Sequence, residues 1–120
     1  MSDLGNILTE EFDVIKGRKE NPEEGSYTSY LFKKGEDKIL KKIGEEASEV
    51  IIASKGGNND ELIGEICDVL FHIEVLLAQK GLSWDDVEGE LMNRRSKTHM
   101  NVEKEAKRAA ENRTDETTIN

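Results

Sequence analysis

Residues 36–55, EDKILKKIGEEASEVIIASK, and residues 61–80, ELIGEICDVLFHIEVLLAQK, decide the fold of this chain. Apolar side chains recur every three to four positions through both segments, and each segment is too long for an ordinary β-strand. The residues between them, GGNND at 56–60, supply glycines that end the first segment and polar side chains that cap the second. We therefore expect two long helices that form an antiparallel hairpin.

Carboxylates interrupt both helices at matching distances from the turn. Glu46 and Glu49 lie near the end of the first helix, and Glu65 and Asp68 lie near the start of the second. In an antiparallel hairpin these i,i+3 pairs reach about the same level, roughly two turns from the bend. Two unit charges about 5.5 Å apart repel by roughly 3 kcal/mol at an effective dielectric of 20, so four such acids favour a bound cation. Hard oxygen ligands in this number predict a Mg²⁺ site.

A helical wheel gives each helix a polar side and an apolar side. On the first helix the apolar sector comprises Ile39, Leu40, Ile43, Ala47, Val50 and Ile51, and the adjoining sector comprises Lys38, Lys42, Glu45, Glu46 and Glu49. On the second helix Glu61, Glu65, Asp68 and His72 form a narrow stripe, and nearly everything else is apolar. A helix that is apolar almost all round is expected to be buried almost all round, so we also expect Cys67 to be a buried thiol.

The alternative interpretation is that the acids face solvent and pair with nearby lysines. It applies readily to the acids of the first helix, because Lys42 lies one turn before them. It applies less well to Glu65 and Asp68, since no lysine or arginine occurs between residues 60 and 79. Spacing alone therefore favours a metal site over solvated acids.

The other segments predict further helices and no strand. Residues 4–16 and 26–32 carry helical apolar repeats, residues 17–25 read as a loop, and residues 83–95 begin with a Ser-x-x-Asp capping box. The predicted fold is therefore all-α. We expect residues 1–95 to form one domain and residues 96–120 to form a charged, weakly docked or frayed tail. Ile52 falls outside the apolar sector of its helix, which indicates a second buried face and hence a subunit interface.

Composition excludes several classes of function. The chain has 120 residues with 26 acidic and 17 basic side chains, and its formal charge of −9 argues against partners such as nucleic acid or acidic membranes. The apolar run at residues 62–78 is interrupted by charged side chains, so we do not expect a membrane span. A single cysteine, Cys67, allows no internal disulfide, and the first residues do not read as a signal peptide. These features predict a soluble, cytoplasmic protein.

Several short motifs resemble those of the phosphoribosyl-ATP pyrophosphohydrolase family. They are Ser26-Tyr27-Thr28, Leu31-Phe32 with Gly35, KKIGEEASEV at 41–50, EICDVLFH at 65–72, Gly81-Leu82-Ser83, and Glu90-Leu91 with Arg94-Arg95. The pattern Glu-Glu-x-x-Glu followed by Glu-x-x-Asp is shared with the wider all-α nucleoside-triphosphate pyrophosphohydrolase (MazG-like) superfamily. The Ser-Tyr-Thr segment and the run Lys-Lys-Ile-Gly-Glu-Glu-Ala indicate the phosphoribosyl-ATP branch. The resemblance covers residues 4–95.

The resemblance implies a fold, a reaction and a set of ligands. The expected fold is a bundle of four to five helices that is completed by dimerisation, so a homodimer is expected. The expected reaction is the Mg²⁺-dependent hydrolysis of phosphoribosyl-ATP to phosphoribosyl-AMP and pyrophosphate, the second step of histidine biosynthesis, by a stand-alone enzyme; Mn²⁺ is an alternative ion. The implied metal ligands are Glu46, Glu49, Glu65 and Asp68. Glu45, next to them, is the candidate catalytic residue that orients or deprotonates the attacking water.

Four further residues are candidates for binding a small-molecule nucleotide. Lys38 and Lys42 share the acidic sector and either meet phosphate oxygens or pair with acids of their own helix. Tyr27 lies in the Ser-Tyr-Thr segment, and the resemblance implies a place in the nucleotide pocket. Arg94, with its neighbour Arg95, either reaches the substrate across a dimer contact or complements a helix C-terminus. His72 either supports a metal ligand or is a core histidine with satisfied hydrogen bonds.

Two alternative functions remain open at this point. The first is a housekeeping nucleoside-triphosphate pyrophosphohydrolase that acts on a nucleotide with another base. The second is a non-catalytic helical dimerisation module in which the acids only keep the surface soluble. Release of pyrophosphate from a nucleotide panel separates the first from the phosphoribosyl-ATP enzyme, and stabilisation by Mg²⁺ tests the second.

Overall fold

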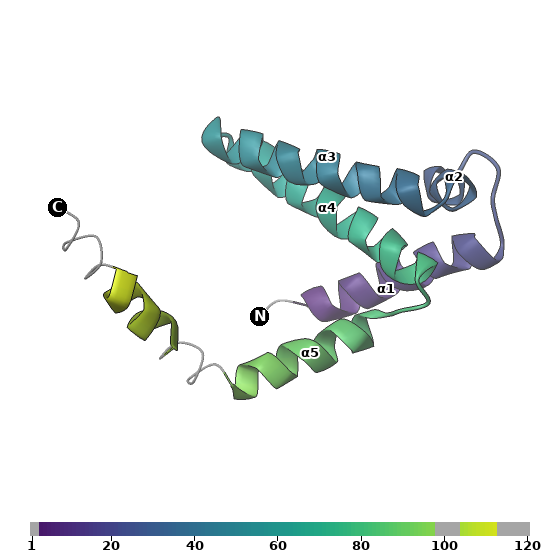
Figure 1. Ribbon diagram of the computed structural model, residues 1–120. Helices are drawn as coiled ribbons and strands as arrows, with labels where there is room; N and C mark the ends of the chain where they lie inside the picture. Colours follow the sequence, from purple (N-terminus) through teal and green to yellow (C-terminus); the bar gives the residue numbers. More distant parts are fainter. Residues whose placement is uncertain (1–2, 98–103, 113–120) are drawn as a thin grey trace. The chain divides into compact units, whose positions relative to one another are not determined.

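The described part of the chain is helical, with short turns between the helices. This computed structural model describes residues 3–97 and 104–112. The helices are α1 (Leu4–Glu20), α2 (Tyr27–Lys34), α3 (Glu36–Lys55), α4 (Asn59–Gln79) and α5 (Trp84–Ser96), and residues 104–112 are also helical (Figure 1). No strand occurs within these residues, so the all-α prediction is confirmed. None of the described helices combines the length and the apolar character that crossing a membrane requires.

The chain divides into two compact units, with the boundary between Trp84 and Asp85. The first unit contains α1 to α4. The second contains nearly all of α5 and the helix at 104–112, whose side chains are exposed. The predicted exposed tail at 96–120 is described only at 96–97 and 104–112; residues 98–103 and 113–120 lie outside the described residues.

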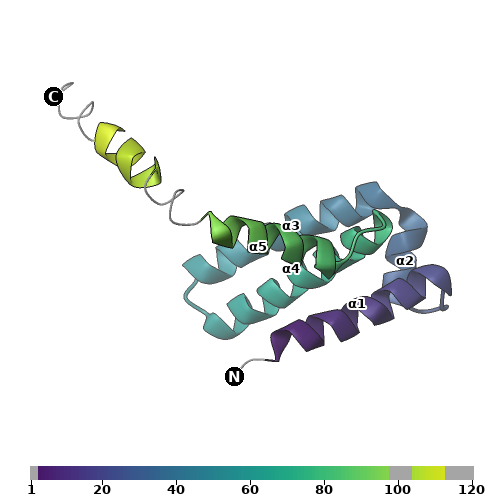
Figure 2. The same cartoon turned by 90° about the horizontal axis from the view of Figure 1, so that it is seen from below.

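Helices α3 and α4 form the predicted antiparallel hairpin (Figures 1 and 2). Gly57 has a φ of 76°, a conformation that side chains disfavour, and it allows the chain to reverse directly after α3. The side chain of Asn58 then accepts a hydrogen bond from the Glu61 N–H at 3.1 Å and caps α4. The hairpin brings the acidic segments of the two helices side by side.

The first two helices differ in how well the sequence predicted them. Helix α1 continues past the predicted end at residue 16 to Glu20, because Gly17 does not interrupt the helix. Lys19, in the added turn, donates a hydrogen bond from Nζ to the carbonyl of Ala78 at 2.8 Å and so ties α1 to the end of α4. Helix α2 begins as predicted after Ser26, whose Oγ accepts from the Ser29 N–H at 3.2 Å.

The core lies where α1, α2, the start of α3 and the second half of α4 meet. Its buried apolar residues are Phe12, Ile15, Leu31, Ile39, Ala53, Val75, Leu77 and Ala78. All but Ala53 lie near this end of the hairpin. The opposite end, beside the turn at residues 56–58, consists of α3 and α4 alone within the first unit.

Burial of α4 is therefore limited to its second half, and the prediction of burial almost all round is wrong for the single chain. Ile63 is 61% exposed and Ile66 is 43% exposed, and Cys67 is an exposed thiol rather than a buried one. On α3 the exposed side includes Leu40 and Ile51, which the helical wheel had placed in the core sector. The physical reason is that a two-helix hairpin covers only one side of each helix, whereas the apolar pattern marks every side that can be covered.

Candidate metal centre

Three carboxylates meet in the middle of the hairpin. Glu46 comes from α3, and Glu65 and Asp68 come from α4; one oxygen of each lies within 4.8 Å of the others. The i,i+3 spacing puts the two acids of α4 on one side of the helix, and the antiparallel pairing places Glu46 opposite them. A single cation can therefore contact oxygens from both helices.

Burial and charge make this cluster unfavourable without a counter-ion. Burial raises the pKa of the Glu65 carboxyl above its usual value, and the neighbouring carboxyls of Glu46, Asp68 and Glu49 raise it further. The Oε2 atom of Glu65 is buried and has no hydrogen-bond partner among the described residues. Such an atom loses its hydration without compensation. An all-oxygen donor set with one unpartnered buried oxygen fits a hard divalent cation such as Mg²⁺ or Mn²⁺.

The other predicted acids lie at the edge of this cluster. Glu49 is exposed and is not part of the group of three, although its charge contributes to the raised pKa of Glu65. Glu45 is also exposed, and its Oε2 lies 3.4 Å from Nζ of Lys42. Lys42 also lies 3.7 Å from the carboxylate of Glu46, so the intrahelical pairing considered for this lysine is present. Lys38 is half-buried and has no hydrogen-bond or ion-pair partner within residues 3–97 and 104–112.

A hydrogen-bonded chain connects α2 to the backbone of Asp68. The hydroxyl of Tyr27 lies 3.0 Å from Nε2 of His72, and Nδ1 of His72 lies 2.7 Å from the carbonyl oxygen of Asp68. Because a carbonyl only accepts, Nδ1 carries the proton, and in the neutral ring Nε2 accepts from the Tyr27 hydroxyl. His72 is buried beside the stacked rings of Tyr27 and Phe71, which both meet it edge-on. This histidine thus supports the helix turn that carries Asp68.

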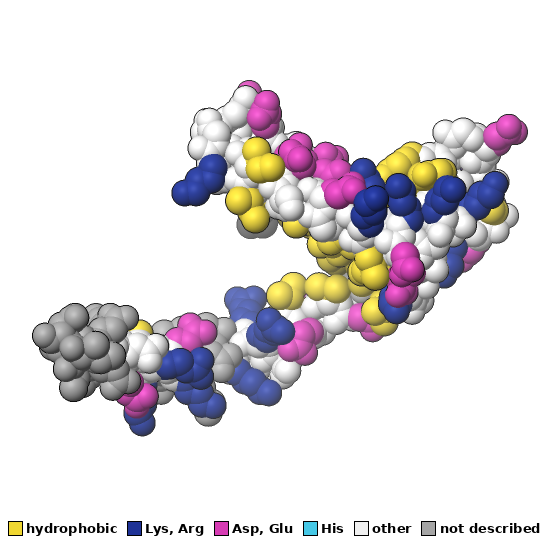
Figure 3. Space-filling view, turned by 45° about the horizontal axis from the view of Figure 1, so that its top comes forward, with side chains coloured by type: hydrophobic (Ala, Val, Ile, Leu, Met, Phe, Trp, Pro, Cys, Tyr) yellow, Lys and Arg dark blue, Asp and Glu magenta, His cyan; other side chains and the backbone are white. Residues whose placement is uncertain are grey.

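Figure 3 shows how charged side chains are distributed over one face of the molecule. Acidic side chains gather along the hairpin, and lysine or arginine side chains lie directly beside them. Lys38, Lys41 and Lys42 precede Glu46 on α3, and Lys33 and Lys34 lie at the end of α2. Cations beside the carboxylates offer sites for anionic groups of a ligand.

Comparison with known proteins identifies the family of this chain. The sequence profile described as phosphoribosyl-ATP pyrophosphohydrolase matches residues 9–95. The chain belongs to the phosphoribosyl-ATP pyrophosphohydrolase family. The phosphoribosyl-ATP pyrophosphatase of Clostridium acetobutylicum is 57% identical over 95 residues, which cover 79% of this chain and 86% of the relative. The protein of the same name from Bacillus cereus (strain AH187) is 56% identical over 94 residues, which cover 78% of this chain and 88% of the relative.

A two-function relative also carries a segment similar to this chain. The histidine biosynthesis bifunctional protein HisIE of Caldanaerobacter subterraneus subsp. tengcongensis is 54% identical over 91 residues, which cover 76% of this chain and 44% of the relative. The resemblance inferred from the short motifs is therefore confirmed. The profile match includes the three clustered acids and every other predicted site residue.

The sequence did not predict one contact beside this site, and the structure does not test the predicted role of Arg94. The contact between Tyr27 and His72 was not predicted, although both residues lie in the motifs that indicated the family. Arg94 belongs to the second unit, where its Nε lies 3.1 Å from Oε1 of Glu90, one turn earlier in α5. Its contact with substrate stays a prediction.

Proposed function

We propose that this chain is a Mg²⁺-dependent enzyme that hydrolyses phosphoribosyl-ATP to phosphoribosyl-AMP and pyrophosphate in histidine biosynthesis. Membership of the phosphoribosyl-ATP pyrophosphohydrolase family supports the substrate and the reaction. The observation that carries the proposal is the convergence of Glu46, Glu65 and Asp68 within 4.8 Å, with one buried carboxylate oxygen left without a partner. Mn²⁺ is the alternative ion, because it accepts the same oxygen ligands.

The reaction requires water to attack a phosphorus atom while a bond between the α- and β-phosphates breaks. A bound divalent cation supplies neutralisation of the phosphate charge. The chain's own residues would do the rest. Glu46, Glu65 and Asp68 would hold the ion, with Glu49 completing its shell from the edge of the cluster. Glu45 would accept the proton of the attacking water and is held near the cluster by Lys42.

Substrate binding would use side chains beside the acids. Lys38 and Lys42 would donate to phosphate oxygens. Lys42 lies next to the carboxylates of Glu45 and Glu46, so it would bring a phosphate group close to the metal centre. Tyr27 would contact the nucleotide, and its hydrogen bond to His72 fixes the ring next to the metal centre. Arg94 would bind the far side of the substrate from a neighbouring subunit.

We further propose that the protein acts as a homodimer in the cytoplasm. The exposed apolar residues of the hairpin support the dimer: Ile51 is 65% exposed, Ile52 is 61% exposed and Ile63 is 61% exposed. Side chains of this kind gathered at one end of a two-helix hairpin indicate a surface that another helical layer covers. A second copy would complete the bundle that the single chain leaves open.

The experiment that tests the reaction is a pyrophosphate-release assay with a panel of nucleotides, with and without Mg²⁺. We expect release from phosphoribosyl-ATP that depends on Mg²⁺ and is lost in Glu46→Gln and Asp68→Asn. Glu61→Gln is the matched control, because Glu61 is an exposed acid on α4 that lies outside the cluster. Near-normal rates in the first two variants would overturn the metal assignment. Preference for another nucleotide would indicate the housekeeping enzyme instead.

A further inference from the structure

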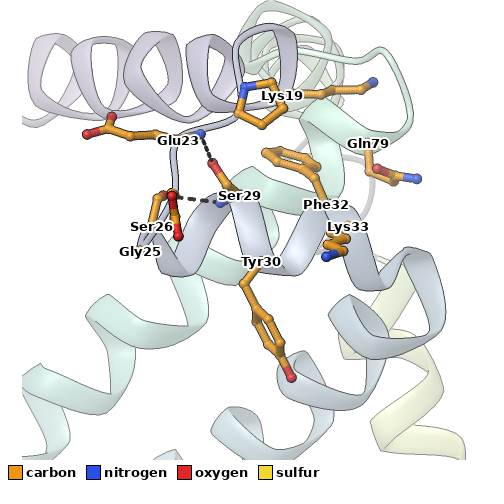
Figure 4. Close-up of a pocket in the computed structure, with 11 residues that line it drawn as sticks. Lys19, Glu23, Gly25, Ser26, Ser29, Tyr30, Phe32, Lys33 and Gln79 are labelled. Atoms are coloured by element: carbon orange, nitrogen blue, oxygen red, sulfur yellow. Dashed lines mark hydrogen bonds between the residues drawn. The ribbon is translucent and has the colours of Figure 1, made fainter.

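A cavity of about 670 Å³ lies beside α2 (Figure 4). The end of α1, the loop before α2, α2 itself and the end of α4 surround it. Its walls include Lys19, Pro22, Ser26, Ser29, Phe32 and Lys33. A volume of this size is typical of sites for small organic ligands, which occupy roughly 300–1,000 Å³.

The polar groups of this cavity are mostly hydrogen-bond donors. Ser26 Oγ accepts from the Ser29 N–H at 3.2 Å, and Ser29 Oγ accepts from the Glu23 N–H at 3.0 Å. Both hydroxyl protons are therefore directed away from these bonds and can be donated to a ligand. Lys33 has no hydrogen-bond or ion-pair partner among the described residues and adds a free ammonium.

The remaining charged side chains of the cavity are largely engaged. Lys19 is held by the carbonyl of Ala78, and Glu23 is paired with Arg18 at 2.9 Å. Glu24 is the other acid in the wall and is exposed. Pro22 and Phe32 give the cavity an apolar side, and Figure 4 shows the Phe32 ring on the same side of α2 as Ser29. Donors beside an apolar wall suit a sugar phosphate, whose ring packs while its oxygens accept.

Two tyrosines connect this cavity to the metal centre. Tyr30 lies in the cavity wall, and its side chain leaves α2 on the side opposite to Ser29 and Phe32 (Figure 4). Its ring stacks on that of Tyr27, with the ring centres 6.1 Å apart and an angle of 25° between the planes. Tyr27 in turn contacts His72 at the metal centre. Both tyrosines are more than 40% exposed, so a planar base can stack on them.

We propose that the cavity at α2 binds the phosphorylated ribose at the far end of the substrate, with Lys33 as the group that pairs with its phosphate. The inference rests on the proposed function. A phosphoribosylated nucleoside triphosphate has a polyphosphate at one end, a base in the middle and a sugar phosphate at the other. Tyr27 contacts His72, which bonds to the backbone of Asp68, and Tyr30 lies in the cavity wall, so the tyrosine pair connects the metal centre with the cavity. The cavity then distinguishes phosphoribosyl-ATP from ATP, which lacks the second sugar phosphate.

The test compares Lys33→Gln with the control Lys55→Gln, which removes the same charge from an exposed position at the end of α3. Loss of a hydrogen bond to a charged group typically weakens binding by about ten- to a hundredfold. We expect kcat/KM for phosphoribosyl-ATP, and its ratio to kcat/KM for ATP, to fall by that factor in Lys33→Gln and not in Lys55→Gln. An unchanged ratio, or an equal loss on both nucleotides, would overturn the inference.

Direct binding separates this inference from the proposed function. Ribose 5-phosphate, titrated by calorimetry into the wild-type chain, should bind more tightly than to Lys33→Gln. Equal binding to both proteins, or no binding to either, contradicts the cavity assignment even if phosphoribosyl-ATP is hydrolysed. Conversely, if the wild type releases no pyrophosphate from phosphoribosyl-ATP, the proposed function fails, and the titration still decides whether the cavity binds a sugar phosphate through Lys33.

Discussion

Replacing Glu74 by glutamine should change how the stability of this protein depends on pH. Glu74 lies on α4 and is fully buried. Its Oε2 accepts a hydrogen bond from Nε1 of Trp84 at 3.1 Å, and its Oε1 has no hydrogen-bond partner among the described residues. The pKa of Glu74 is raised from 4.5 to about 8: burial is the largest cause, the nearby carboxyl of Glu11 on α1 adds to the rise, and the Trp84 hydrogen bond opposes it.

The sign and size of the effect follow from the two pKa values. Between pH 4.5 and about 8 the folded protein keeps a proton on Glu74 that the unfolded chain releases, so the free energy of unfolding falls as pH rises. A change from 4.5 to about 8 corresponds to about 5 kcal/mol over that interval, since each pKa unit is worth about 1.36 kcal/mol. This free energy is comparable to the whole stability of a small domain.

Glu74→Gln keeps the shape of the side chain and removes its ionisation. Its carbonyl can still accept from Trp84, and its amide can donate to the carboxylate of Glu11. We therefore expect the variant to be more stable than the wild type above about pH 8 and to lose the part of the pH dependence due to this site. Glu10→Gln, an exposed acid on the same helix as Glu11, is the control and should follow the wild-type curve.

Urea denaturation at a series of pH values measures the free energy of unfolding, and tryptophan fluorescence reports on the ionisation of Glu74. Trp84 is the single tryptophan of the chain, so its emission should titrate with a midpoint near the raised pKa of about 8 in the wild type and not in Glu74→Gln. Parallel stability curves for the two proteins, together with fluorescence that does not change in this range, would refute the reasoning.

Three further substitutions test other contacts. Tyr27→Phe removes the hydroxyl that binds His72, and we expect the free energy of unfolding, measured by urea denaturation, to fall by about 0.5–1.5 kcal/mol. We also expect a lower kcat/KM, and unchanged kinetics would contradict a role of Tyr27 at the site. Asn58→Ala removes the cap on the Glu61 N–H and should cost about 1 kcal/mol in the same assay, whereas an unchanged midpoint would show that the cap is not needed. Ile63→Asp places a charge on the exposed apolar surface and should convert dimers into monomers in sedimentation velocity; a wild type that sediments as a monomer would contradict the proposed interface.

The local features of the fold could be predicted from the sequence because their causes are local. Helix α3 begins and ends at the predicted residues, since Gly35 and Gly56 stop the helical repeat at either side. The convergence of Glu46 with Glu65 and Asp68 follows from i,i+3 spacing and a short turn, both of which are visible in the chain. For the same reason the predicted Ser26 cap of α2 is present.

Features that depend on which surfaces meet could not be predicted. Cys67 and Ile66 lie in an apolar pattern, yet both are exposed, since none of the described helices of the single chain covers them. Glu74 reads as a polar interruption of an apolar helix, and nothing in its spacing indicates that Trp84, ten residues later, folds back to it. The pairing of Tyr27 with His72 joins residues 45 positions apart and depends on how α2 packs against α4.

Binding of Mn²⁺ tests the central claim most directly, because free Mn²⁺ gives a paramagnetic resonance signal that is lost when the ion is bound by protein. We expect saturable binding by the wild type and by the control Glu61→Gln, and its loss in Glu65→Gln, which neutralises the carboxylate with the unpartnered buried oxygen. Equal Mn²⁺ binding by all three proteins, or no binding by the wild type, would contradict a metal centre formed by Glu46, Glu65 and Asp68.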